Sequence, residues 1–252
     1  MDYCYAKAEE SMTARKTTEM KKILSPSIMC ADIGRLREEI ALLDAAGADM
    51  FHLDITDGEF VPNFALSWCD FRAIRSTTNK PMDVHLMTRN PGIHLSYAYK
   101  NKANIAYVHY ESGNAANYLE DIKKNGLEAG LAINPDTKLS EFYPLLFLID
   151  RLLVMRVHPG FAASPAVPKV ERKLYQLTKL QNRKFKIVLD GAVSPEVIAK
   201  WSQKGVDEFV LGTASGMFGA KRDGRTYGEI VENLRACTQD GMLDFSTWKK
   251  TA

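Results

Sequence analysis

The sequence predicts an α/β protein that folds as a single (β/α)8 barrel, the TIM barrel architecture. Short β-rich runs alternate eight times with longer amphipathic runs from Ile23 onward, and no low-complexity linker interrupts them. The length of 252 residues is usual for one such barrel. An open doubly wound sheet is the alternative fold, but no Gly-x-Gly-x-x-Gly turn follows an early β-rich run to support it.

The β-rich runs are rich in Ile, Val, Leu and Met, and we expect each to form a strand. They are 23–30, 50–56, 82–87, 105–111, 128–134, 151–157, 186–191 and 208–214. The runs expected to be helices are 35–47, 67–77, 92–102, 115–126, 138–149, 168–181, 195–205 and 228–240. Ser194 followed by Pro195 is a typical helix start. We expect residues 22–240 to form the barrel, 1–21 a flexible extension and 241–252 a tail.

Composition excludes several classes of protein. Hydrophobic residues make up 46% of the chain, charged residues 25%, and the net charge is only +2. This balance predicts neither a nucleic-acid nor a membrane partner. The four cysteines form no Cys-x-x-Cys pair, the first residues lack a secretory signal, and no apolar run is long enough to span a bilayer. We therefore expect a cytoplasmic enzyme.

Polar residues stand at three expected strand ends. His52 and Asp54 are two apart and so share one face of a strand, His85 ends the next strand, and Asp190 ends the seventh. Singly, each has an ordinary explanation as a hydrogen-bonded or turn-capping residue. Because a barrel brings these strand ends together, the set predicts a site for one divalent ion, and Zn, Fe, Mn and Co all remain open.

The two aspartates suggest a reaction. Strands two and seven are three apart in an eight-stranded ring, so Asp54 and Asp190 would approach a substrate from separate directions. One carboxylate can remove a proton beside a carbonyl while the other donates one to the opposite face, with a metal stabilising the enediolate. Met29, Met87 and Met155 also fall near strand ends and can wall such a site with apolar surface.

Glycine-containing turns follow the last three strands, where barrel enzymes commonly bind phosphate through backbone amides. These turns contain Gly160-Phe161, Gly191-Ala192 and Gly212-Thr213. His109 and Glu111 end the fourth strand, and two roles stay open for them: bordering the site, or making a structural hydrogen bond.

The chain resembles the ribulose-phosphate 3-epimerase family, which includes the allulose-6-phosphate 3-epimerases, from about residue 25 to residue 218. The motifs that carry this resemblance are Pro26-Ser27-Ile28, His52-Leu53-Asp54, Asp57-Gly58, Phe60-Val61-Pro62-Asn63, Asp83-Val84-His85-Leu86-Met87, Val108-His109, Asn134-Pro135, Val154-Met155, Pro159-Gly160-Phe161 and Asp190-Gly191.

The resemblance implies a barrel of the ribulose-phosphate-binding type that is homo-oligomeric and acts on a sugar phosphate. It implies metal ligands at His52, Asp54, His85 and Asp190, with Asp54 and Asp190 as the acid/base pair. The residues that it implies for substrate contact are Ser27, Met87, Met155, Gly160, Phe161, Gly191, Gly212 and Thr213.

Several residues depart from the family pattern. Thr56 replaces a third capping methionine, Glu59 replaces a histidine, and Arg156 stands where Thr or Ser is usual. In the expected phosphate turns, Ala162-Ala163 and Ala192 replace glycines. An added methyl obstructs a backbone that needs positive φ or close approach to a phosphate. These departures bear on phosphate binding and substrate choice.

The leading hypothesis is a metal-dependent 3-epimerase that converts D-ribulose 5-phosphate to D-xylulose 5-phosphate, with D-allulose 6-phosphate as the alternative substrate. A second hypothesis is a barrel lyase or aldehyde-condensing synthase. Such enzymes place a lysine beside their strand-borne aspartates, and the stretch from Asp54 to Asp57 has none. A third is a non-catalytic barrel that keeps its metal but has a degraded phosphate loop.

Overall fold

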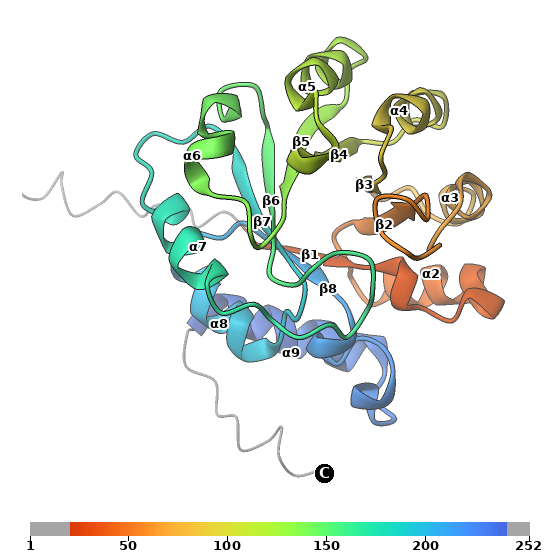
Figure 1. Cartoon of the computed structure of the whole chain (residues 1–252). Coiled ribbons are helices and arrows are strands. Elements are labelled where there is room, and N and C mark those ends of the chain that lie inside the picture. Colours follow the sequence, from red (N-terminus) through yellow and green to blue (C-terminus); the bar gives the residue numbers. More distant parts are fainter. Residues whose placement is uncertain (1–20, 241–252) are drawn as a thin grey trace, which may run out of the picture.

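The computed structural model describes residues 21–240, and it confirms the predicted barrel. Apart from Lys21, the predicted extension 1–21 and tail 241–252 lie outside the described residues. Eight parallel strands form one sheet in the order β1-β8-β7-β6-β5-β4-β3-β2 (Figure 1). The strands are β1 (Ile23–Pro26), β2 (Phe51–Thr56), β3 (Met82–Met87), β4 (Ile105–His109), β5 (Glu128–Ile133), β6 (Arg151–Met155), β7 (Lys186–Asp190) and β8 (Glu208–Leu211).

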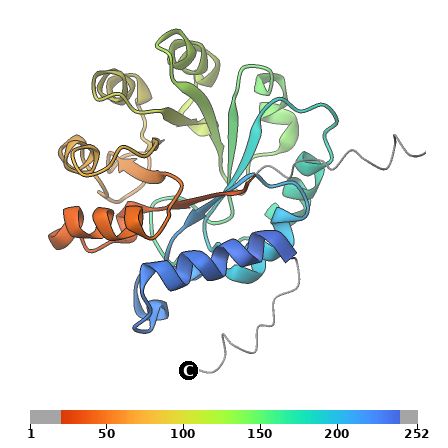
Figure 2. The same cartoon turned by 180° about the vertical axis from the view of Figure 1, so that it is seen from behind.

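Helices surround the sheet on its outer side, as Figures 1 and 2 show from opposite directions. They are α2 (Leu36–Ala45), α3 (Trp68–Arg75), α4 (Pro91–Lys100), α5 (Ala115–Lys124), α6 (Leu139–Phe142), α7 (Val170–Thr178), α8 (Pro195–Ser202) and α9 (Tyr227–Asp240). The hydroxyl of Ser194 accepts a hydrogen bond from Val197 N and caps α8, as the sequence predicts. None of the described helices is long and apolar enough to cross a membrane.

Several elements are shorter than their sequence patterns predict, and three of these differences have a clear cause or a consequence for the site. The run 138–149 forms only α6 and a 3-10 turn, Tyr143–Leu145, because Pro144 has no N–H to donate and its ring clashes with the preceding helical turn. The first strand ends at Pro26, and the 3-10 turn Ile28–Cys30 follows it. The eighth strand ends at Leu211, so Gly212 and Thr213 lie in a turn.

The barrel closes where β1 meets β2, and these two strands make fewer contacts with each other than the other neighbouring strands do. Ser27 and His52 form an isolated parallel bridge. Below it, Asp49 N donates to Leu24 O (3.1 Å) and the Asp49 carboxylate accepts from Leu24 N (2.8 Å). The seam therefore brings Ser27 beside the strand that carries His52 and Asp54.

The strands are buried on both faces, as expected for parallel strands covered by helices. Apolar side chains that point outward pack beneath the helices, while a second cluster, including Tyr107, Leu153 and Val188, fills the barrel interior. Strand register places Asp54 opposite His85 and Met155 opposite Asp190. The alternation of inward-facing and outward-facing residues therefore turns Asp54, His85 and Asp190 toward the interior of the barrel.

Charged side chains that form ion pairs lie at the opposite end of the barrel interior. Arg151 on β6 donates to Glu208 on β8, and its Nε donates to Glu128 (2.5 Å). Burial raises the pKa of Glu208 to about 7, because the Arg151 guanidinium offsets only part of the cost of desolvating the carboxylate.

Candidate metal centre and active site

Four side chains carried by β2, β3 and β7 converge inside the barrel. One ligand atom each from His52, Asp54, His85 and Asp190 lies within 4.8 Å of all the others. His85 Nδ1 is 3.0 Å from Asp54 Oδ1 and 3.8 Å from Asp190 Oδ2. His52 Nε2 is 3.3 Å from Asp54 Oδ1 and 4.0 Å from Asp190 Oδ2. The structure therefore brings together all four residues that the sequence singles out.

This cluster fits a divalent ion. Ligand atoms about 2.1 Å from one ion lie roughly 3 to 4.2 Å from one another, and the four histidine-to-aspartate distances above fall in that range. Within the described residues, His52 Nε2 is buried and makes no hydrogen bond. Two imidazole nitrogens and two carboxylate oxygens are donors that first-row transition ions accept. The four residues can hold a metal ion, and the donor set does not select which one.

Each imidazole also has a partner on its far side. His52 Nδ1 lies 2.7 Å from Asp83 Oδ1, and His85 Nε2 lies 2.8 Å from His109 Nε2. His109 Nδ1 is in turn 3.0 Å from Glu111 Oε2. Such outer partners orient histidine ligands and fix their tautomers.

Of the two roles left open for His109 and Glu111, the structural hydrogen bond is the one that the geometry supports. The role of Asp83 was not predicted from the sequence. Its signal was present, because Asp83 stands two residues before His85 and so shares that inward face of β3.

The two candidate catalytic carboxylates have opposite electrostatic environments. Burial opposes ionisation of Asp54, but His52 and His85 outweigh it and lower the pKa of Asp54. Burial raises the pKa of Asp190, and the neighbouring Asp54 charge raises it further, although His52 and His85 partly oppose the shift. Environments that push two carboxyl pKa values apart equip one to accept a proton and the other to donate one.

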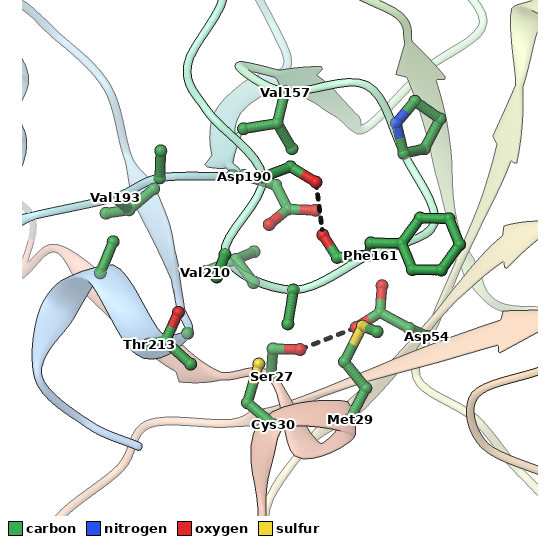
Figure 3. Close-up of a pocket in the computed structure, with 18 of the residues that line it drawn as sticks. Ser27, Met29, Cys30, Asp54, Val157, Phe161, Asp190, Val193, Val210 and Thr213 are labelled. Carbon is green, nitrogen blue, oxygen red and sulfur yellow. Dashed lines mark hydrogen bonds between the residues drawn. The ribbon is translucent and has the colours of Figure 1, made fainter. Parts of the chain in front are cut away.

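A cavity of about 370 Å³ opens above these carboxylates, and Asp54 and Asp190 both line it. Figure 3 shows them reaching it from different strands, with Ser27 Oγ donating to Asp54 Oδ2 (2.7 Å). The remaining wall is largely apolar, and the expected Met29, Met87 and Met155 all contribute to it with the half-exposed ring of Phe161.

The three expected phosphate turns line the same cavity. It is bordered by Gly160 to Ser164 after β6, Asp190 to Val193 after β7, and Gly212 to Ala214 after β8. Gly160 has φ +111° and a Cβ there would meet Val61 Cβ at 2.9 Å, so only glycine fits. Ala163 and Ala192 have φ of 60° and 49°. These two alanines thus occupy the left-handed region that glycine adopts more easily.

Comparison with known proteins shows the family of this chain. The sequence model of the ribulose-phosphate 3-epimerase family matches residues 23–216. The chain belongs to the ribulose-phosphate 3-epimerase family. The chloroplastic ribulose-5-phosphate-3-epimerase of Arabidopsis thaliana is 34% identical over 220 residues, which cover 85% of this chain and 76% of that protein. The ribulose-phosphate 3-epimerase of Synechocystis is also 34% identical over 220 residues, covering 84% of this chain and 93% of that one.

More distant structures show that this member of the epimerase family shares its fold with other barrels. The tryptophan synthase alpha subunit of Legionella pneumophila is 16% identical, with a TM-score of 0.58 over 92% of this chain and 97% of that chain. Thiamine phosphate pyrophosphorylase from Pyrococcus furiosus is 15% identical, with a TM-score of 0.58 over 86% of this chain and 96% of that chain. At such identities the likeness concerns the fold alone.

Proposed function

We propose that this protein is a metal-dependent isomerase that interconverts D-ribulose 5-phosphate and D-xylulose 5-phosphate. The observation that carries the proposal is the meeting of Asp54 and Asp190, from strands three apart in the ring, beside one ion-sized cluster on the floor of a cavity. Membership of the epimerase family and the names of its relatives support the same reaction. Zinc, iron, manganese and cobalt are the candidate ions.

In this proposal Asp54 and Asp190 act on opposite faces of C3. Asp54 removes the C3 proton, and Asp190 delivers a proton to the other face. In the reverse direction their roles exchange. A divalent ion bound by the four ligands would stabilise the negative charge that develops on the enediolate. Ser27 fixes Asp54 by its hydrogen bond to Oδ2.

The cavity wall serves the same chemistry. Met29, Met87 and Met155 place thioether and methylene groups over the reacting carbon, which excludes water that would otherwise protonate the intermediate at random. The phosphate group of the substrate binds at the turns containing Gly160, Gly191 and Gly212, through backbone amides. Lys221 also lines the cavity and adds positive charge there.

A panel of ketose phosphates tests the proposal. The metal-free protein is loaded in turn with Zn²⁺, Fe²⁺, Mn²⁺ or Co²⁺ and assayed with ribulose 5-phosphate and allulose 6-phosphate. We expect epimerisation at C3, fastest with ribulose 5-phosphate, and its loss in Asp190→Asn. Faster turnover of allulose 6-phosphate would reassign the substrate. Tight metal binding without turnover of either sugar would instead support the non-catalytic barrel.

A further inference from the structure

Arg156 lies immediately behind the turn that follows β7. Its backbone N donates to Asp190 O (2.7 Å), and its side-chain Nη1 donates to Ala192 O (2.5 Å) and, at 3.4 Å, to Gly191 O. One residue thus binds three consecutive carbonyl groups, beginning with that of a candidate catalytic aspartate. The guanidinium is largely buried, with 10% of its side chain exposed.

This arrangement determines where the amides of the turn point. In a trans peptide the C=O of one residue and the N–H of the next point in opposite directions. Because the carbonyls of residues 190–192 face Arg156, the amides that follow them face away from it. The Gly191 amide interacts with the Asp190 carboxylate, so the amides of Ala192 and Val193 are the two that can face an anion. Residues 190–193 line the cavity and Arg156 does not, so the side away from Arg156 is the cavity side. Successive amides turned to one side form an anion-binding concavity.

The turn needs such support because of its sequence. Gly191 has φ +90°, and Ala192 has φ +49° although it carries a Cβ. The left-handed region is less favourable for alanine than for glycine, so Ala192 favours other conformations when nothing holds it. The hydrogen bond from the Arg156 guanidinium to the carbonyl oxygen of Ala192 is stronger than one between neutral groups, and it stabilises the left-handed conformation of Ala192.

Two outer helices fix the guanidinium itself. Arg156 Nη2 lies 3.4 Å from Glu171 Oε1 on α7. The other oxygen of Glu171 accepts from Lys200 on α8. The carboxylate therefore links the two helices that follow β6 and β7, and it holds the guanidinium against the turn.

We propose that Arg156 is a positioning residue that holds the turn 190–193 in its anion-binding conformation. The inference rests on the proposed function, because the anion is taken to be the phosphate group of the substrate. Arg156 does not touch the substrate; it acts through the carbonyl groups of Gly191 and Ala192.

The test compares Arg156→Met with a matched control, Arg183→Met. Arg183 also donates to backbone carbonyls, those of Phe185 (2.9 Å) and Gly205 (2.6 Å), but at the opposite end of β7. The readouts are KM and kcat for ribulose 5-phosphate, competitive inhibition by inorganic phosphate, and metal affinity. We expect Arg156→Met to raise both KM and the phosphate inhibition constant about tenfold, with kcat changed less than about threefold and metal affinity unchanged.

Arg183→Met should lower the thermal midpoint without altering phosphate inhibition. Arg156→Lys keeps the charge but lacks the planar guanidinium, so we expect a smaller loss of phosphate binding than in Arg156→Met. If Arg156→Met does not fold, Arg156→Lys provides the test. Unchanged phosphate inhibition in the folded Arg156 variants, or an equal loss in Arg183→Met, would overturn the inference. A wild-type protein that neither epimerises ketose phosphates nor binds phosphate would contradict the proposed function itself, which is a different result.

Discussion

Replacing His109 with leucine tests whether the imidazole behind His85 sets the affinity of the metal centre. In the structure His109 Nδ1 faces the Glu111 carboxylate (3.0 Å), so His109 Nε2 is free to accept from His85 Nε2 (2.8 Å). That hydrogen bond leaves the lone pair of His85 Nδ1 directed at the cluster. Burial lowers the pKa of His109 to about 4, despite the opposing effect of Glu111, so the imidazole is neutral at pH 7 and can accept.

The expected loss of metal affinity follows from the unpaired N–H group that the substitution leaves on His85. Leucine cannot accept a hydrogen bond, so the buried N–H of His85 loses its partner, which costs about 1 to 3 kcal/mol. The hydrogen bond strengthens when His85 binds a cation, so much of this cost falls on the metal-bound state. A loss of that size corresponds to a metal affinity about 10- to 100-fold weaker, the range typical for outer partners of metal ligands.

The assay is chelator competition on the metal-free protein with Zn²⁺ and Co²⁺, together with the visible spectrum of the Co²⁺ form, which reports ligand geometry. His158→Gln is the control, because His158 has 64% of its side chain exposed and lies outside the cluster. We expect weaker binding and an altered spectrum in His109→Leu, and neither change in His158→Gln. A folded His109→Leu protein with wild-type metal affinity would refute the reasoning.

Two further predictions concern charged residues outside the metal ligands. The pKa of Glu208, about 7, exceeds the ordinary value of 4.5, so the folded state retains a proton that the unfolded state releases. The contribution of Glu208 to the free energy of unfolding therefore falls by about 3 kcal/mol as pH rises from 4.5 to 7. Urea unfolding should show a flatter pH dependence in Glu208→Gln, but not in a variant of the exposed Glu232; an unchanged slope in Glu208→Gln would contradict this assignment. Lys221→Gln should raise KM for ribulose 5-phosphate about three- to tenfold while metal affinity stays the same, and an unchanged KM would remove Lys221 from the substrate site.

The barrel and the grouping of His52, Asp54, His85 and Asp190 could be predicted from the sequence, because both depend on short-range periodicity. Residues two apart on a strand share a face, which placed His52 beside Asp54, and parallel strands in a barrel bring their ends together. The prediction of one helix over 138–149 was wrong, although the proline at position 144 was a local signal that the helix would end early.

Three other contacts could not be predicted, because they depend on strand register and on the conformation of loops, and no local sequence pattern determines either. The contact between His52 and Asp83 requires β2 and β3 to pair in one particular register. Lys221 reaches the cavity only because the turn Ala220–Arg222 lies over it. By alternation Arg156 is expected to point away from the barrel interior, but its hydrogen bonds to the β7 turn arise from the conformation of that turn.

Proton exchange at C3 tests most directly whether Asp54 and Asp190 divide the two faces of the substrate. Ribulose 5-phosphate is incubated in D2O with the metal-loaded wild-type protein or with Asp190→Asn of verified metal content, and C3 is followed by NMR. We expect the wild-type protein to form xylulose 5-phosphate carrying deuterium at C3, and the variant to form none. Epimer with deuterium at C3, formed by Asp190→Asn at the wild-type rate, would contradict the two-carboxylate account.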